Sequence, residues 1–539
     1  FILKYSTMKK TNKNILLGVL GLLLAFGIYS CEDKFLDEEE NYLIDSENYF
    51  NSETDYYLAL VGAYDLLQAT YVNNLLGEIA SDNTLCGGES ATDVIGFQQI
   101  DDMTHNPVNS NLRDVWNWMF AGVKRANYFL EFQDKTDFDG RLEMVAEVRF
   151  LRAYYHFELV KWFGGIPVKE YDNALLGQGK RFAPGDETSI PRYSASDIYA
   201  LIITDLIYAV NNLEYIAPQA GRVNKGAAEA LLGKAFLYYP SDNTIFNDIS
   251  SITPKIITND YLGLEEDSEI NKYYAASVTL QNLINSGPYQ LSNDYAQIFE
   301  LEGENGVESV FEVQYTDGEG AGFGCLQCSE GNVAVGFMGI RNHTGPTYDS
   351  GYSFNVPVQA AFDAFTPGDN RRDVSILDIV AWANDTGAEY VEGYEHTGYY
   401  NRKYLPRKGD QNIGDQNLTN PNNYRSIRYA DVLLMAAEAL NRGEIDDAQA
   451  LAYVNQVRER AFGNSNSNIS ASGPQLTAAI WEERRLELMG EGHRFFDLVR
   501  TGQAASAIEG FEPGKHEVFP IPFEEIQFSN GNWNQNPNY

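Results

Sequence analysis

The sequence has no surplus of basic residues. Of its 539 residues, 76 are Asp or Glu and 39 are Lys or Arg, which gives a formal net charge of −37. Proteins that bind nucleic acid attract phosphates with clustered Lys and Arg. The charge therefore argues against a nucleic-acid partner and against docking on anionic lipid, whereas neutral and cationic ligands remain open.

Cysteine is also scarce, with four in the chain. Cys325 and Cys328 have the spacing of a redox pair, but they lie in a glycine-rich stretch and not at a helix start, which argues against a thioredoxin-like site. A zinc site would need a second such pair. We expect these two residues to form a local disulfide or to be free thiols, in a chain that does not depend on a disulfide scaffold.

Motifs of catalysis are missing as well. The six histidines include no H-E-x-x-H pair, and no G-x-S-x-G sequence occurs. A P-loop fails because Ala235 follows Gly233-Lys234 and Ala228 stands at the first glycine position. Among 76 acids, a carboxylate pair for glycoside hydrolysis could arise by chance. Nothing favours an enzyme, and a glycosidase stays open as an alternative.

The sequence has one long apolar run, near the N-terminus. The stretch from Ile15 to Ile28 has about 14 residues, which fits a signal peptide and is shorter than the ~20 that a membrane-spanning helix needs. We expect Met8 to be the true start and residues 1–30 to be a signal peptide of the lipoprotein type. The basic residues that precede the apolar run are Lys9, Lys10 and Lys13.

The end of this segment, Ile28-Tyr29-Ser30-Cys31, resembles a bacterial lipobox, whose cysteine is lipidated and becomes the mature N-terminus. The alternative is a general secretory signal with an incidental cysteine. Acyl chains on Cys31 would anchor the protein in a membrane. The acidic run that follows, up to Glu40, would be a solvated tether, and it also resembles the signal that sends Bacteroidetes lipoproteins to the cell surface.

Helical periodicity is the main signal that the chain does carry. From Arg141 to Phe163, apolar residues recur at spacings of four and three, which predicts a helix with one face packed on a partner. Gly164 and Pro167 then end the helix. Further helices are expected near 55–71, 112–132, 196–213, 225–239, 272–285 and 476–499.

The segment 428–461 reads as two helices with a turn at Gly443, about the length of a tetratricopeptide repeat. Such a pair cannot bury its apolar face alone, so it should stack on the earlier helices in a degenerate array. The segment 241–420 differs, because glycine, asparagine and tyrosine dominate and a strand is expected near 308–315. Binding loops are expected there.

Aromatic residues are in excess, with 35 Tyr, 29 Phe and 6 Trp. Many belong to helix faces, but others lie in expected loops, where helical packing does not explain them. An aromatic ring offers a flat apolar face to a sugar ring, and tyrosine adds a hydroxyl group. Local packing remains the alternative for each one.

Six sequence blocks resemble those of a known protein family. They occur in the same order as in that family and cover nearly the whole mature chain. Together with the lipobox they resemble SusD/RagB-type nutrient-binding outer-membrane lipoproteins of Bacteroidetes. The blocks are AEVRFLRAYYHFELVKWFGGIPV, GRVNKGAAEALLGKAFLYY, SIRYADVLLMAAEALNRG, ERRLELMGEGHRFFDLVRTG, HEVFPIPFEEI and QNPNY.

The resemblance implies a mostly α-helical fold, in which tetratricopeptide-like helix pairs support an irregular, loop-rich ligand-binding part. It implies no catalysis and no obligatory cofactor, although some members bind calcium. Members capture oligosaccharides, or peptides in some cases, for a SusC-like TonB-dependent transporter. We therefore expect a lipid-anchored protein of the outer membrane that faces the cell surface. A repeat scaffold that binds only protein is a further alternative.

The expected organisation is a helical part at 31–240, an irregular ligand-binding part at 241–420 and a C-terminal helical part at 421–539 that packs on the first. The family blocks are scaffold, so the ligand contacts must come from loops. The residues expected to contact the ligand are Asp82, Asn83, Phe97, Tyr315, Tyr348 and Tyr352.

Overall fold

A computed structural model describes residues 49–240, 271–318, 322, 325–410 and 418–539. The chain divides into two compact units, Phe1–Asn51 and Ser52–Tyr539, and every element below belongs to the second. The signal segment, Cys31 and the acidic run after it lie outside the described residues. Within the described ranges, no helix has the length and apolar character needed to cross a membrane.

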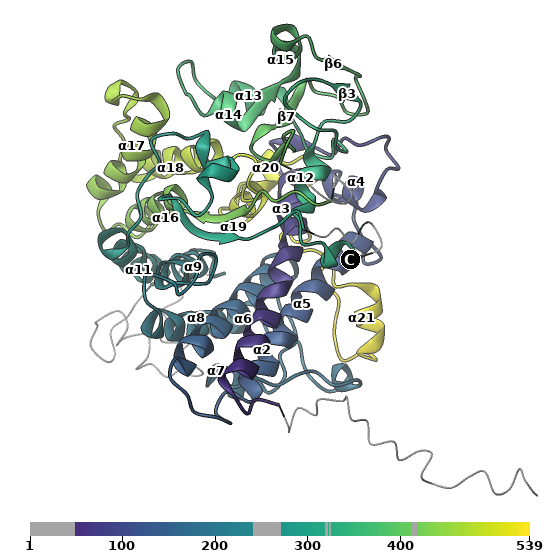
Figure 1. The fold of residues 1–539 in the computed structure, drawn as a ribbon, viewed down its shortest axis with the longest axis vertical. Helices are drawn as coiled ribbons and strands as arrows, with labels where there is room; N and C mark the ends of the chain where they lie inside the picture. The colour runs from purple at the N-terminus through teal and green to yellow at the C-terminus, as the bar shows by residue number, and fades with distance from the viewer. Residues whose placement is uncertain (1–48, 241–270, 319–321, 323–324, 411–417) are drawn as a thin grey trace, which may run out of the picture. The chain divides into compact units, whose positions relative to one another are not determined.

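The fold is mostly helical, as predicted, and its long helices form an array. Successive members pack on one another from α5 through α6, α8, α9, α11 and α16 to α17 (Figure 1). The helix α11, which the sequence placed in the irregular part, packs between α9 and α16. The long helices are α2 (Glu53–Asp65), α5 (Ser110–Glu131), α6 (Arg141–Phe163), α8 (Ala195–Asn212), α9 (Lys225–Tyr238), α11 (Lys272–Ser286), α16 (Tyr429–Arg442), α17 (Asp447–Phe462) and α18 (Gly473–Glu487).

Local sequence signals set where several of these helices begin. Ser52 and Ser194 each form a capping box with the Asp three residues later, at the starts of α2 and α8. The side chain of Asn224 accepts a hydrogen bond from the Ala227 amide at the start of α9. Gly164, with φ of 66°, ends α6.

The helix α6 is buried on more than its predicted face. Its apolar stripe is buried, but so are several charged side chains on its other faces. Arg149 and Arg152 both donate to Asp205 of α8 at 2.7 Å. Because each buried charge has a partner, α6 can be enclosed by neighbours on all sides.

Two predicted helices are wrong in their extent. The first helix stops at Asp65, continues as the 3-10 turn η2 (Leu66–Thr70) and resumes as α3 (Tyr71–Ile79). The helix expected over 476–499 is broken, because Gly490 and Gly492 adopt φ of 86° and 84°, which L-residues rarely adopt. The chain resumes after this break as α19 (Arg494–Arg500).

Short elements make up the irregular part. Among the described residues, strands pair in four antiparallel two-stranded sheets: β1 (Thr84–Leu85) with β4 (Val356–Pro357), β2 (Ser309–Val313) with β8 (Tyr424–Arg428), β3 (His343–Thr344) with β6 (Glu389–Tyr390), and β5 (Ile376–Asp378) with β7 (Tyr399–Asn401). The short helices of this part are α12 (Val333–Met338), α13 (Gln359–Asp363), α14 (Arg372–Ser375) and α15 (Ile379–Thr386). Other short helices lie in the two helical parts: α4 (Ile95–Asp101), α7 (Tyr171–Leu175), α20 (Ala504–Ala507) and α21 (Phe523–Phe528).

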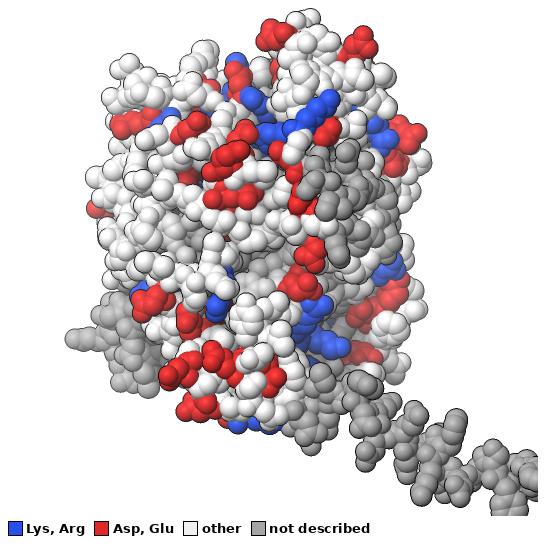
Figure 2. All heavy atoms as spheres, viewed as in Figure 1, with Lys and Arg blue, Asp and Glu red and all other residues white. Residues whose placement is uncertain are grey.

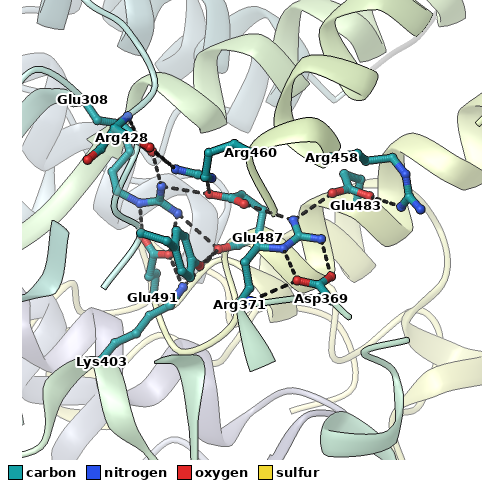
Figure 3. A network of polar contacts seen from close by, with 12 residues as sticks. Glu308, Asp369, Arg371, Lys403, Arg428, Arg458, Arg460, Glu483, Glu487 and Glu491 are labelled. Atoms are coloured by element: carbon teal, nitrogen blue, oxygen red, sulfur yellow. Dashed lines mark hydrogen bonds and ion pairs between the residues drawn. The ribbon is translucent and has the colours of Figure 1, made fainter. Parts of the chain in front are cut away.

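A buried network of ion pairs fastens this irregular part to the C-terminal helices (Figure 3). Arg371 donates to Glu483 at 2.7 Å and to Glu487 at 3.0 Å, and both acceptors belong to α18. Arg428 of β8 contacts Glu487 and Glu491 at 3.0 and 2.7 Å. Burial alone would raise the pKa of Glu487, but the surrounding cations hold it well below its usual range.

The CxxC pair is a disulfide between Cys325 and Cys328, one of the two predicted alternatives. Cys86 is a buried free thiol.

Figure 2 shows Lys and Arg side chains in small groups interspersed with more numerous acidic ones over the face in view, in keeping with the net charge of −37.

Candidate functional site

An open groove of about 800 Å³ lies on the irregular part, where β3 and β6 pair near the top of Figure 1. Its volume falls in the usual range for ligand sites. The strand pair brings His343 opposite Tyr390 and Thr344 opposite Glu389, so segments 45 or more residues apart share one surface. The groove is lined by Arg341, Asn342, His343, Thr344, Ser350, Gly351, Tyr352, Glu389, Tyr390 and Val391.

Arg341 is held in place at one wall of the groove. Its guanidinium pairs with Asp93 at 3.0 Å and lies 3.7 Å from the carboxylate of Glu89. It also lies 5.8 Å from the centre of the Tyr352 ring, in range of a cation–π contact. The Asp93 carboxylate accepts from the Glu89 amide at 2.8 Å as well, so the 89–93 turn and Arg341 fix one another.

The backbone around the groove is strained. Asn342 and Ser353 have φ of 53° and 57°, and Val94, beside the Asp93 contact, has φ of 43°. For a β-branched residue such as Val94 this conformation is unusual and costs energy. Gly351 passes so close to Gly339 that an added Cβ would meet its Cα at 2.3 Å. Strained backbone is common at binding sites, so its presence on this wall favours a functional role.

His343 stabilises the turn that forms the floor. Its Nδ1 lies 3.1 Å from the carbonyl oxygen of Ile340, and its Nε2 lies 3.1 Å from that of Tyr348. The Trp382 ring packs on this side chain, with 5.9 Å between ring centres.

The chemistry of the groove suits a neutral, hydroxyl-rich ligand. Tyr352 and Tyr390 are half-buried, so part of each ring is open to the groove. Arg341, Asn342 and Glu389 supply donors and acceptors on the same surface. Rings with polar groups around them can stack on a sugar and bind its hydroxyls.

Of the six predicted ligand contacts, Tyr352 is the one that lines this groove. Its ring lies 5.8 Å from Phe337, which packs edge-on against Phe97 at 5.6 Å. Phe97 is only 2% exposed and supports the wall from behind. Tyr348 is 3% exposed and lies in the hydrophobic cluster beneath the floor, with its hydroxyl accepting from Arg402 at 3.1 Å.

The remaining three lie elsewhere and have other partners. Asp82 forms a two-pronged ion pair with Arg494, at 2.7 and 2.8 Å. Asn83 is fully buried and accepts from Arg485 at 2.9 Å. Tyr315 is half-buried and donates its hydroxyl to the Gln68 carbonyl at 2.9 Å. The carboxylate of Asp82 and the side-chain oxygen of Asn83 thus join the first helical part to the last.

Sequence reasoning missed most of the groove. Arg341, Asn342 and His343 are consecutive and follow a helix of six residues that is too short to show periodicity. Tyr390 and Glu389 come from a two-residue strand. The composition of 241–420, rich in Gly, Asn and Tyr, predicted that the ligand-binding loops lie in this segment. It did not indicate which residues of the segment line the groove.

No metal site accompanies the groove in the part of the chain that the structure describes, where no three His, Cys, Asp or Glu side chains gather closely enough to hold an ion. Calcium binding therefore stays a prediction. The carboxylates near Arg341 are committed to its guanidinium.

Known proteins give this arrangement a context. A profile of the SusD family matches residues 378–539, and a profile described as starch-binding and associating with the outer membrane matches residues 34–237. A solved structure described as a laminarin binding SusD-like protein is 33% identical, with a TM-score of 0.76, over 90% of this chain and all of that one. The chain belongs to the SusD family.

Other SusD-family proteins match it over similar lengths. SusD-like protein P38 of Formosa agariphila is 26% identical over 530 residues, which is 93% of this chain and 94% of that protein. Surface glycan-binding protein A from Bacteroides thetaiotaomicron, in complex with laminarihexaose, is 25% identical with a TM-score of 0.74, over 90% of this chain and 100% of that one. The predicted SusD/RagB resemblance and the mostly helical SusD-like fold are confirmed.

Proposed function

We propose that this SusD-family protein binds an oligosaccharide in the groove between β3 and β6 and releases it unchanged. The observation that carries the proposal is the shared surface of Tyr352 and Tyr390 with Arg341, Asn342 and Glu389 in an open groove of about 800 Å³. The rings stack on apolar faces of the sugar, and the polar groups bind its hydroxyls.

A laminarin-type glycan is the first candidate for the ligand. Two structural relatives, 33% and 25% identical, are described as binding laminarin or as a complex with laminarihexaose. The net charge of −37 is compatible with a neutral glycan and unfavourable for an anionic one.

The groove also favours binding without catalysis. Glycoside hydrolysis by the usual mechanism needs two carboxyl groups on either side of the scissile bond. Among the described residues that line the groove, Glu389 is the one carboxylate. The nearby Asp93 is paired with Arg341 at 3.0 Å, so it is poorly placed to act as an acid or a nucleophile.

The test is a titration of the purified protein with laminarihexaose, a starch oligosaccharide and a mixed peptide pool, with chromatography of each mixture afterwards. We expect heat of binding with an oligosaccharide and no new product. Release of shorter sugars would support the glycosidase alternative instead. Binding of peptides alone would support a peptide-binding member of the family.

We further propose that acyl chains on Cys31 anchor the protein at the outer membrane, where it delivers glycan to a SusC-like TonB-dependent transporter. The lipobox-like sequence supports the anchor, and the outer-membrane description of the matching family supports the location. Cells grown with a labelled fatty acid should label the wild-type protein in the membrane fraction and not the Cys31→Ala variant. Equal labelling of the two would contradict the anchor, and failure to co-purify a transporter from cross-linked membranes would contradict the partner.

A further inference from the structure

A second cavity, of about 400 Å³, lies on the side of α5 and shares no lining residue with the groove. Four of its aromatic rings follow one another around it. Phe182 lies 6.5 Å from Phe120, Phe120 lies 4.7 Å from Trp116, and Trp116 lies 6.4 Å from Trp533. The exposed Phe528 also lines the cavity.

The walls of the cavity are fixed by hydrogen bonds between distant parts of the chain. The Trp533 indole donates to the Ile190 carbonyl at 2.7 Å, and the Asn532 amide donates to the Glu187 carbonyl at 3.0 Å. Arg113 of α5 pairs with Glu524 of α21 at 2.8 Å. These contacts hold the C-terminal segment beside α5, as Figure 1 shows, so the cavity is formed before any ligand arrives.

The charges around the rings favour a cation. Glu187 and Glu525 line the cavity together with the Trp116 ring. Burial raises the pKa of Glu525, and the neighbouring Glu187 raises it further, so a bound cation would stabilise the charged form of this carboxyl group. Among the described lining residues Lys124 is the one cation, and it is exposed to solvent, where water screens its charge.

The cavity offers fewer polar side chains to a sugar than the groove does. Apart from these charged residues, Asn117 and Asn127 are the remaining polar side chains of the lining. Asn127 is already used, because it accepts from Arg152 at 3.1 Å and donates to the Lys180 carbonyl at 3.2 Å. A sugar would therefore find fewer partners for its hydroxyls here than in the groove.

We propose that this cavity binds an organic ammonium ion with an aromatic or aliphatic body. The rings enclose the apolar body and offer their negative faces to the cation, and Glu525 and Glu187 balance its charge. This site is separate from the oligosaccharide groove and does not depend on it.

The experiment compares three probes of similar size by calorimetry: benzyltrimethylammonium, the neutral benzyl alcohol and the anionic phenylacetate. We expect the cation to bind about tenfold more tightly than the alcohol, and phenylacetate to bind most weakly. Equal affinity for cation and alcohol, or tighter binding of phenylacetate, would overturn the proposal.

Two variants in the cavity and one in the groove test whether the cation binds in this cavity. Glu525→Gln removes the charge and keeps nearly the same size of side chain, and it should weaken binding of the cation about tenfold while leaving that of benzyl alcohol unchanged. Glu187→Gln is a second variant should the first fail to fold. Tyr352→Ala, in the separate groove, should leave the affinity of the cation unchanged. An unchanged affinity of the cation in both Glu variants, or loss of it in Tyr352→Ala, would refute the assignment.

Discussion

At the end of α3, the carboxylate of Glu78 is fully buried. One oxygen accepts from the Gly492 amide at 2.6 Å, whereas Oε2 has no hydrogen-bond partner among the described residues. Burial raises the pKa of Glu78 to about 7. In the native state this group therefore binds a proton more tightly than in the unfolded chain, where its pKa is near 4.5.

It follows that Glu78 makes the protein less stable as pH rises from about 4.5 to 7. Glu78→Gln keeps the oxygen that accepts from Gly492 and removes the titration. The quantity to compare is the unfolding free energy of the variant minus that of the wild type. This gain should be about 2 to 3 kcal/mol larger at pH 8 than at pH 5. Denaturant titrations at both pH values measure it, with the exposed Glu53→Gln as a matched control. A gain that does not change with pH would contradict the assignment.

Single residues also show what the sequence could not reveal. Tyr352 was predicted from an aromatic side chain in an expected loop, and the groove includes it. Asp82 and Asn83 were predicted as hydrogen-bonding groups in the loop after the first helix, but their partners Arg494 and Arg485 are more than 400 residues away in the chain. A polar loop residue that binds a ligand and one that pairs with a remote arginine look alike until the fold brings the partners together.

At the scale of elements, periodicity predicted the long helices well, because each must bury an apolar face. It missed the break between α18 and α19, where the pattern of apolar residues continues through Gly490 and Gly492. The break is associated with a close contact between parts of the chain that are far apart in the sequence. The backbone of Gly492 lies against α3, and a Cβ on Gly77 would meet the Gly492 oxygen at 2.6 Å. The two-residue strands of the groove are too short for any periodic signal.

This close approach predicts opposite outcomes for two helical glycines. Alanine favours a helix over glycine by about 1 kcal/mol, so Gly62→Ala in α2, where a Cβ would meet nothing within 4 Å, should raise the melting temperature. Gly77→Ala in α3 should lower it, because overpacking costs about 1 to 3 kcal/mol. Thermal unfolding followed by circular dichroism compares the two. A stabilised Gly77→Ala protein would mean that α3 and the α18–α19 break do not touch as described.

At the scale of the whole described unit, a helical array carries an irregular part that the ion pairs of Arg371 and Arg428 fasten to α18. The array was predictable from repeat-length helix pairs and from the family blocks. The groove was predictable only as a region, because its lining combines residues 341–352 with residues 389–391, and Arg341 is held from outside the lining by Asp93. The division of labour that results, a rigid helical scaffold and a ligand surface on short elements, is what the proposed oligosaccharide capture needs.

The most direct measurement is a calorimetric titration of laminarihexaose into the wild type and into Tyr352→Ala and Tyr390→Ala, with Phe528→Ala, an exposed ring outside the groove, as the control. Loss of a stacking ring should weaken binding about tenfold in each groove variant. The control should bind as the wild type does. Unchanged affinity in both groove variants, with the sugar still bound, would contradict the claim that this groove holds the glycan.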